Sequence, residues 1–301
     1  MDRFPCLNRL LTIAILVMAS GSSQSFAQTS TLSHGPSIDA IRAKGVLTIG
    51  VCDDPPWSMN SAINIGSGVI PDMMLAFAAR EGIAKVDMQP MPFASFIGAL
   101  TSGRIDIAAD TLTPNPARAE IIDFPDDVVF DPGGLIVAPG NPLHVHQNAD
   151  LTNGIRVSAF EGALYGKALL ADIARGQKIK VFVVPGFNEA VNAVVSGQVD
   201  AALVDAVNAE FALKQNPDLR FELVPDFNPT GTRDKAWLSV MPNGTVADVG
   251  FAKSQPDLTA AWNKDFAAMS KEGVIDKIFE KYGLTPSKYV ASPSDPAYVK
   301  P

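Results

Sequence analysis

Cysteine and histidine are scarce: the chain of 301 residues has two cysteines and three histidines. Cys52 is the only cysteine after the N-terminal apolar segment, so we expect no disulfide within the exported chain. His144 and His146 would share one strand face, but His34 is the only other histidine and no third ligand is evident. We therefore expect no metal site and no cofactor. No Ser/His/Asp pattern and no glycine-rich phosphate loop is present.

Positive charge is also in deficit. The chain has 24 lysines and arginines against 32 acidic residues, a net charge of -8. This balance argues against nucleic acid as a partner, because phosphate binding depends on clustered basic residues. After residue 27, no apolar run approaches the length of a transmembrane helix. The length is enough for one large domain or two of ordinary size.

The first residues have the pattern of a secretory signal peptide. Arg3 and Arg9 precede an apolar run that ends near Met18, and small residues surround a cleavage position after Ala27. Cys6 lies before the apolar run, so lipidation at the cleavage site is not expected. We expect residues 1–27 to be removed and the remaining protein, with a net charge of about -9, to be soluble and exported.

Alternating strand and helix patterns predict an α/β fold with mostly parallel sheets. Residues 45–51 are short, β-branched and bounded by glycine, which predicts a buried strand. Residues 71–82 predict a helix with Pro71 at its first position and Gly82 just past its end. Residues 93–103 predict a second helix, and residues 104–109 a second strand.

A pattern of apolar helix, Ser-Gly and strand occurs twice, at 96–110 and at 190–205. Two similar units favour two related lobes over a solenoid, which needs more and shorter repeats. Chance is the alternative, because joints of this kind are common.

Two segments rich in proline and glycine, 131–143 and 225–234, are candidate crossings between the lobes. The domain prediction is one discontinuous lobe and one continuous lobe, with hinges at 130–133 and 229–232. Predicted helices at 257–273 and 274–283 would complete the discontinuous lobe. It would contain residues 28–130 and 232–301, and the continuous lobe would contain residues 131–231.

The segment "DTLTPNPAR" (110–118) lies where ligands bind in open α/β sheets, beyond the carboxyl end of a strand. Asn115 can cap a helix that starts at Pro116, which directs free N–H groups and the Arg118 guanidinium to the same crevice. That combination suits a carboxylate. Thr111 and Thr113 can add hydrogen bonds. The alternative is that Arg118 is a solvated helix residue that pairs with a neighbouring acid.

Acidic and aromatic residues follow other strands at the same expected edge. Asp205 ends the strand of the second repeat, where a carboxylate can receive an ammonium group. "CDDPPWS" (52–58) follows the first strand and brings Asp53, Asp54 and Trp57 to the rim. An aromatic face near carboxylates suits a cation. Ordinary turn chemistry is the alternative for this loop.

Four blocks in this order resemble the polar amino-acid-binding family of periplasmic solute-binding proteins of ABC transporters, family 3. They are "GVLTIGV…PPW", "FASFIGALTSGRIDIA…PARAEIIDF", "SGQVDAALVD" and "AMSKEGVIDKIFEKYG". The resemblance covers the whole chain after the signal peptide. It implies a two-lobed type II periplasmic-binding-protein fold and a monomer that delivers a small zwitterion to a membrane permease with its ATPase.

The resemblance also implies roles for individual residues. Arg118 would clamp an α-carboxylate with help from Thr111 and Thr113, and Asp205 would take the α-ammonium. Leu164 stands where the family has a threonine that helps hold the carboxylate. The predicted ligand-binding residues are Asp53, Trp57, Phe93, Asp110, Thr111, Thr113, Arg118, Phe160, Leu164, Tyr165 and Asp205.

The ligand and the activity have alternatives. "GVIPDMM" and the stretch from Glu161 to Tyr165 resemble the branch that binds ectoine-like compatible solutes. We predict a basic amino acid or a cyclic or methylated zwitterion over acidic amino acids, because aromatic faces and carboxylates favour a cation. We expect a binding protein and not an enzyme. Exported dehydratases with this fold are the rival class, and Glu161 or Asp110 would then be the general acid. A sensor ligand domain is disfavoured.

Overall fold

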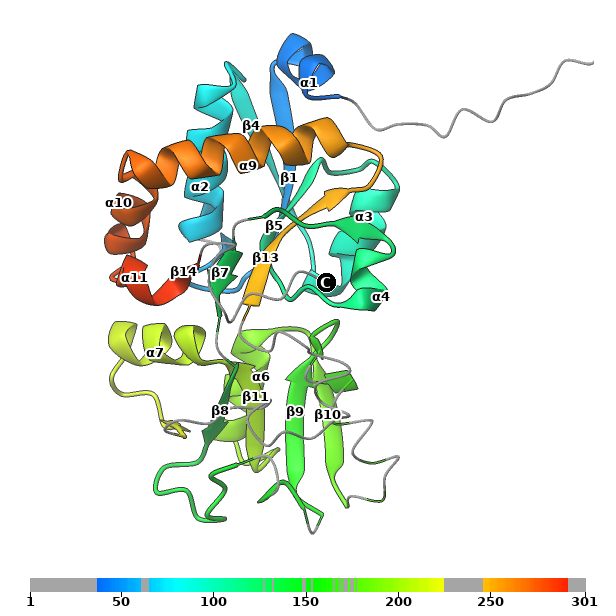
Figure 1. Cartoon of the computed structure of the whole chain (residues 1–301). Helices are drawn as coiled ribbons and strands as arrows, with labels where there is room; N and C mark the ends of the chain where they lie inside the picture. Colours follow the sequence, from blue (N-terminus) through cyan, green and yellow to red (C-terminus); the bar gives the residue numbers. More distant parts are fainter. Residues whose placement is uncertain are drawn as a thin grey trace, which may run out of the picture. The chain divides into compact units, whose positions relative to one another are not determined.

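Two mixed sheets organise the part of the chain that the computed structural model describes (Figure 1). Residues 33–301 form one compact unit, and residues 1–36 lie outside the described residues. The predicted signal peptide is therefore not described. The described residues are 37–291 without 61–64, 127, 132, 148–149, 153, 165, 168, 170–172, 174–175, 177 and 225–245.

The first sheet has the strand order β14-β7-β13-β5-β1-β4, with β6 also paired to β13. Its β1, β4 and β5 are parallel to one another, whereas β13 is antiparallel to β5. Two separate parts of the chain, residues 46–130 and residues 246–291, contribute the strands of this sheet. Its strands are β1 (Val46–Val51), β4 (Lys85–Pro90), β5 (Ile107–Leu112), β6 (Ile122–Asp123), β7 (Val128–Phe130), β13 (Val246–Ala252) and β14 (Val290–Ala291).

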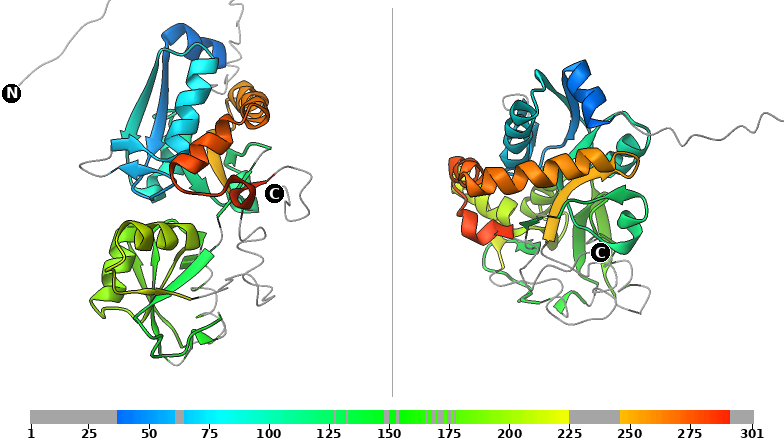
Figure 2. Two further views of the ribbon diagram at one scale, coloured as in Figure 1. Left: turned by 90° about the vertical axis from the view of Figure 1, so that its left-hand side faces the viewer. Right: turned by 45° about the horizontal axis from the view of Figure 1, so that its top comes forward.

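Helices pack on both faces of the first sheet. Helix α9 crosses α2, and helix α10 also packs against α2 (Figures 1 and 2). The rings of Phe77 in α2 and Trp262 in α9 meet edge to face at 5.4 Å. Helix α3 packs against β5 and β13. The helices are α1 (Ile38–Lys44), α2 (Val69–Arg80), α3 (Phe96–Thr101), α4 (Pro116–Ala119), α9 (Pro256–Lys271), α10 (Val274–Lys281) and α11 (Pro286–Tyr289), with the 3-10 turn η1 (Phe93–Ser95) before α3.

The second sheet has the order β10-β9-β11-β8-β12, in which β9 is parallel to both β10 and β11, and β8 is antiparallel to β11. Helices α6 and α7 pack against its strands. A two-stranded ribbon of β2 (Met59–Asn60) and β3 (Ile65–Ser67) is separate. The elements of the second sheet are β8 (Gly133–Val137), β9 (Arg156–Phe160), β10 (Lys180–Val184), α6 (Phe187–Val195), β11 (Ala201–Asp205), α7 (Ala206–Gln215) and β12 (Glu222–Leu223).

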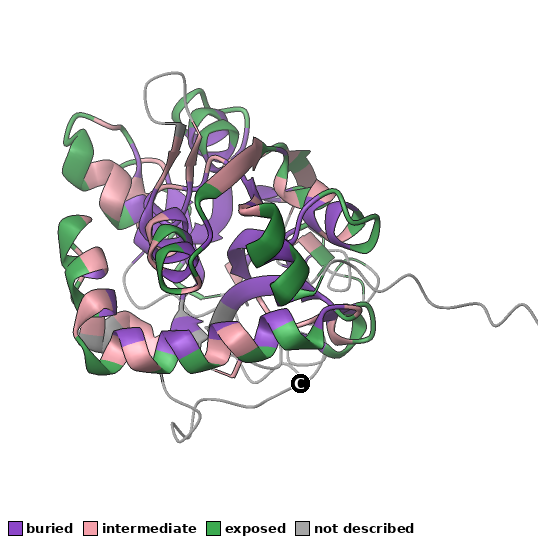
Figure 3. Cartoon of the chain, turned by 90° about the horizontal axis from the view of Figure 1, so that it is seen from above, coloured by how far each residue is buried: buried purple, intermediate pink, exposed green. Residues whose placement is uncertain are grey.

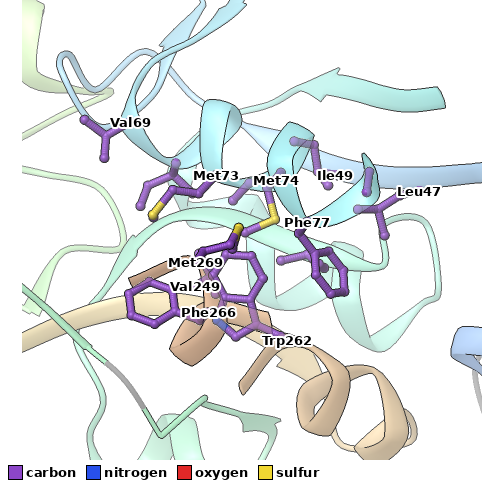
Figure 4. Close-up of a cluster of buried hydrophobic side chains, with 14 of the residues drawn as sticks. Leu47, Ile49, Val69, Met73, Met74, Phe77, Val249, Trp262, Phe266 and Met269 are labelled. Atoms are coloured by element: carbon purple, nitrogen blue, oxygen red, sulfur yellow. The ribbon is translucent and has the colours of Figure 1, made fainter. Parts of the chain in front are cut away.

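Buried positions concentrate in the strands and on the inner faces of the helices (Figure 3). The largest core cluster joins β1, α2, β13 and α9 (Figure 4). Leu47 and Ile49 of β1 are fully buried there, as are Phe77 and Met269. Burial of side chains of this size stabilises the fold by about 1.5–3 kcal/mol each. The strands that carry the candidate site are therefore held by a packed core.

Two predicted boundaries differ from the structure. Helix α2 begins at Val69, so Pro71 is its third residue and not its first. The N–H groups of Val69 and Ile70 donate to the carbonyls of Pro56 and Trp57, so the preceding loop supports the earlier start. The second predicted strand, 104–109, is displaced to β5 at Ile107–Leu112. The lobe boundaries remain a prediction, because the second crossing lies within residues 225–245.

Candidate functional site

A small cavity is lined by residues from both sheets and by most of the predicted binding residues. Its volume is about 20 Å³, close to the room that one water molecule needs. The predicted residues on its wall are Phe93, Thr111, Thr113, Arg118, Phe160, Leu164 and Asp205. Asp131 and Ala163, which the sequence analysis did not select, complete the wall. Segments from residue 93 to residue 205 therefore converge on one small cavity.

Arg118 is held in a fixed position at this cavity. The predicted cap is present, because Asn115 Oδ1 accepts a hydrogen bond from the Arg118 backbone N–H at 2.9 Å and Pro116 starts α4. The guanidinium donates from Nη1 to the Thr113 carbonyl at 2.8 Å and from Nη2 to the Gly162 carbonyl at 2.9 Å. Burial lowers the pKa of Arg118 to about 10, which leaves it charged at neutral pH. Arg118 is thus a buried cation and not a solvated helix residue.

Gly162 brings the turn after β9 against the turn that carries Phe93. Its φ of +85° is a conformation that residues with a side chain rarely adopt. A Cβ atom at this position would lie 3.0 Å from the Cα atom of Ala94. This close approach allows the Gly162 carbonyl to reach the Arg118 guanidinium. The glycine therefore serves the contact between elements of the two sheets.

Aromatic rings form one side of the cavity. Phe93 and Phe160 meet edge to face with ring centroids 5.8 Å apart. The Arg118 guanidinium carbon lies 5.7 Å from the Phe93 ring centroid, within the range of cation–π attraction. Phe93 also packs against Phe96 of α3 at 5.6 Å. Phe93 therefore combines a core contact with a position on the cavity wall.

Two carboxyl groups face the same cavity as Arg118. Asp205 is the last residue of β11, beside Gly133 of β8 in the strand register, and it is buried. Asp131 follows β7 at the point where the chain leaves the first sheet, and it is also buried. Oppositely charged groups at one small cavity can hold both ends of a zwitterion.

Two further carboxyl groups lie near this wall, Asp54 on a larger neighbouring cavity and Asp110 beside Thr111 in β5. Asp54 and Asp110 are buried, and Asp110 Oδ2 accepts a hydrogen bond from the Cys52 thiol. Burial, followed by the charges of neighbouring aspartates, raises the pKa of Asp54 well above its usual value. Burial raises the pKa of Asp110 to about 7, and burial and the charge of Asp205 raise that of Asp131. The region is therefore rich in negative charge that protons or a cation can neutralise.

These raised pKa values predict a dependence of stability on pH. Between about pH 4 and pH 7 the folded protein holds more protons than the unfolded chain, so the free energy of unfolding falls as the pH rises through this range. Without ligand, we expect an unfolding temperature several degrees lower at pH 8 than at pH 5.5, measured by circular dichroism. The difference should shrink in Asp131→Asn. An equal or higher unfolding temperature at pH 8 would contradict the raised pKa values.

Asp53 lines a neighbouring cavity of about 240 Å³, which shares Phe93 and Phe160 with the first. Asp53 Oδ2 accepts a hydrogen bond from Asn188 Nδ2 of α6 at 2.8 Å, and Asp53 Oδ1 accepts one from the Asn60 backbone N–H at 3.2 Å. Asp53 thus joins the loop after β1 to helix α6, which packs on the second sheet. It lies at the larger space beside the cavity and not on the wall with Arg118.

Trp57 and Asp110, two of the predicted ligand-binding residues, do not lie on the wall of this cavity. Trp57 is fully buried in the core, where its ring meets Phe279 at 6.0 Å and Tyr289 at 6.2 Å. The loop carbonyls that support the start of α2 direct it inward. Asp110 belongs to β5 itself, and successive strand residues point to opposite faces. Thr111 consequently faces the cavity and Asp110 is buried behind it.

Other candidates from the sequence are not brought to this cavity. Tyr165 lies outside the described residues. Glu161, one of the two proposed general acids, is exposed, as are His144 and His146. Within the described ranges, no group of three or more potential ligands could hold a metal ion. The same ranges contain no helix with the length and apolar character needed to cross a membrane.

Known proteins are similar to most of this chain. The model of the bacterial extracellular solute-binding proteins, family 3, matches residues 47–285. The lysine/arginine/ornithine-binding periplasmic protein of Escherichia coli (strain K12) is 28% identical over 191 residues, which are 63% of this chain and 69% of that protein.

Solved structures are similar over most of the chain. An ancestral arginine-binding protein bound to arginine is 28% identical with a TM-score of 0.69, and the match covers 79% of this chain and 98% of that one. EhuB in complex with hydroxyectoine is 21% identical with a TM-score of 0.69, and the match covers 83% of this chain and 93% of that one. The second likeness supports the fold alone.

Proposed function

Because the chain belongs to family 3 of the bacterial extracellular solute-binding proteins, we propose that it is the substrate-binding component of an ABC uptake transporter. The family and the α/β fold predicted from the sequence are confirmed, although antiparallel pairs make both sheets mixed. In this proposal the exported protein captures a small zwitterion in the periplasm and delivers it to a membrane permease with its ATPase. Removal of residues 1–27 on export belongs to the same proposal.

One observation carries this function. Arg118 and Asp205, which have opposite charges, line the same cavity. A guanidinium offers paired N–H donors that match a carboxylate, and a buried carboxylate can receive an ammonium group. Thr111 and Thr113 stand on the same wall and can add hydrogen bonds. The α-carboxylate and α-ammonium groups of an amino acid, or their equivalents in a derivative, have this combination of charges.

Lobe closure is the second part of the proposal. Residues 28–130 and 232–301 would form one lobe and residues 131–231 the other, with hinges at 130–133 and 229–232. An amino acid is much larger than the 20 Å³ cavity, so the walls must separate to admit it. Closure around the ligand would then exclude water and strengthen its contacts with Arg118 and Asp205.

The buried acids favour a ligand with a positive charge on its variable part. Asp54, Asp110 and Asp131 would repel an acidic side chain in a region where water cannot screen the charges. Phe93 and Phe160 offer faces that attract cations. We therefore propose a basic amino acid or a cyclic or methylated zwitterion, and the ectoine-type alternative remains within this class.

Titration calorimetry with six ligands tests this preference. We expect arginine, histidine, ectoine or glycine betaine to bind at least about tenfold more tightly than glutamate and aspartate, because one unfavourable buried contact with a charge costs more than 1 kcal/mol. Native mass spectrometry of the freshly purified protein should reveal a bound small molecule of the same class. Tighter binding of glutamate or aspartate than of the other four would refute the preference and leave the binding function standing.

We propose binding without turnover. Glu161 is exposed and Asp110 lies behind the cavity wall, so neither candidate acid is on the wall that Arg118 shares. An enzyme would convert its ligand, whereas a transport protein returns it unchanged. Nuclear magnetic resonance of the ligand after a long incubation with the protein, compared with a sample without protein, distinguishes these two outcomes.

A further inference from the structure

Asp131 is a second buried carboxyl group on the cavity wall, and one of its two oxygens has no hydrogen-bond partner among the described residues. It lines the same 20 Å³ cavity as Arg118 and Asp205, although only 5% of its surface is exposed. Its Oδ1 atom is buried and accepts no hydrogen bond from the described part of the chain. An acceptor left in this condition costs free energy, and a ligand donor can relieve that cost.

The charges on the cavity wall do not balance for a neutral zwitterion. Arg118 supplies one positive charge, whereas Asp131 and Asp205 can supply two negative charges. A zwitterion carries no net charge and would leave one negative charge in excess. A ligand with a net charge of +1 would remove the excess. The neighbouring buried carboxyl groups of Asp54 and Asp110 increase the preference for positive charge.

We propose that Asp131 is a specificity-determining residue that selects ligands with a second positive charge, beside the ammonium group that Asp205 receives. This inference rests on the proposed binding function and names the residue that sets its ligand class. Asp131 lies where the chain passes from β7 to β8, so its carboxyl group is placed at a junction of the two sheets. A contact there would couple recognition of the cation to the crossing between the lobes.

When no ligand is bound, a proton on Asp131 can take the place of the ligand's second positive charge. Burial and the charge of Asp205 raise the pKa of Asp131, while the nearby hydroxyl of Thr111 and indole of Trp57 lower it. The groups that interact with this carboxyl also include Asp54, Asp110 and the phenol of Tyr289. Arg118 faces the same cavity. Binding of a ligand with a second positive charge should therefore release, on average, a fraction of a proton per protein molecule.

Arginine and citrulline form the probe pair, because they have similar shape and differ in the charge of the side chain. In titration calorimetry of the full exported chain, we expect arginine to bind about 10- to 100-fold more tightly than citrulline. Asp131→Asn should reduce that ratio to within about threefold, mainly by weakening arginine. It should also lower the proton release measured in two buffers with different ionisation enthalpies.

Asp106→Asn is the matched control. Asp106 is also buried and precedes β5, about 16 Å along the strand from Thr111, and it accepts a hydrogen bond from Thr48 N–H. It should keep the wild-type ratio. Circular dichroism should confirm that both variants fold.

An unchanged ratio in Asp131→Asn would overturn the role of Asp131. Equal binding of arginine and citrulline by the wild type, or binding of neither, would overturn it as well. In the last case, binding of ectoine or glycine betaine would keep the proposed transport function, whereas binding of none of these ligands would refute that function too.

Discussion

Replacing Arg118 with alanine is expected to abolish measurable binding of any ligand that carries a carboxylate. The variant loses a buried guanidinium that keeps its charge at neutral pH. Removal of one partner from a buried, hydrogen-bonded charge pair costs 2–5 kcal/mol, so the dissociation constant should rise at least about 30-fold. Titration calorimetry with the tightest ligand of the six measures this loss.

Two further variants isolate the reason for the loss. Arg118→Lys keeps the charge but cannot reproduce the two parallel N–H donors, so its binding should also be poor. Arg220→Ala removes an exposed arginine and should bind as the wild type does. We expect Arg118→Ala to fold, because Arg118 lies on a cavity wall outside the hydrophobic clusters. Normal affinity in folded Arg118→Ala would end the assignment of Arg118 to the carboxylate.

Replacing Asp205 with asparagine should weaken binding in a way that depends on the ligand's cation. A primary ammonium group concentrates its charge on one nitrogen and loses a charge-assisted hydrogen bond, for which we expect a loss of about 10- to 100-fold. Ectoine has a positive charge delocalised over a ring, so its loss should be smaller. The measurement is the ratio of dissociation constants, variant to wild type, for arginine and for ectoine.

Asp218→Asn provides the control, because Asp218 is exposed on the loop after α7. It should leave both affinities unchanged. Equal losses for arginine and ectoine in Asp205→Asn would show that Asp205 supports the fold of the β11 end without distinguishing the cations.

The sequence predicted the first strand and the long helix near the C-terminus but not the direction of individual side chains. The strand predicted at 45–51 corresponds to β1, and the helix predicted at 257–273 corresponds to α9, which ends at Lys271. The second strand was placed three residues too early, which put Asp110 on the rim together with Thr111. In a strand, one residue of displacement exchanges the two faces. A pattern of apolar residues cannot fix that register.

The positions of Trp57 and Asp131 depended on tertiary contacts. An aromatic residue beside two aspartates suggests a cation site, but the carbonyls of the loop after β1 bind the start of α2 and direct Trp57 into the core. Asp131 stands in a Pro/Gly segment that indicated only a crossing. Arg118, in contrast, was found because a resemblance to a family and a local helix cap pointed to the same residue.

Hydrogen bonds across the two sheets have a consequence for kinetics. Asn188 binds Asp53, Asn208 binds Asp54, and the Arg118 guanidinium donates to the Gly162 carbonyl. A ligand held between the two sheets would leave only after these bonds break. Its residence time is then governed by the opening rate of the protein more than by its own contacts. Such a protein would keep its ligand on dilution. It would release the ligand mainly on binding to a partner surface that favours separation of the two sheets.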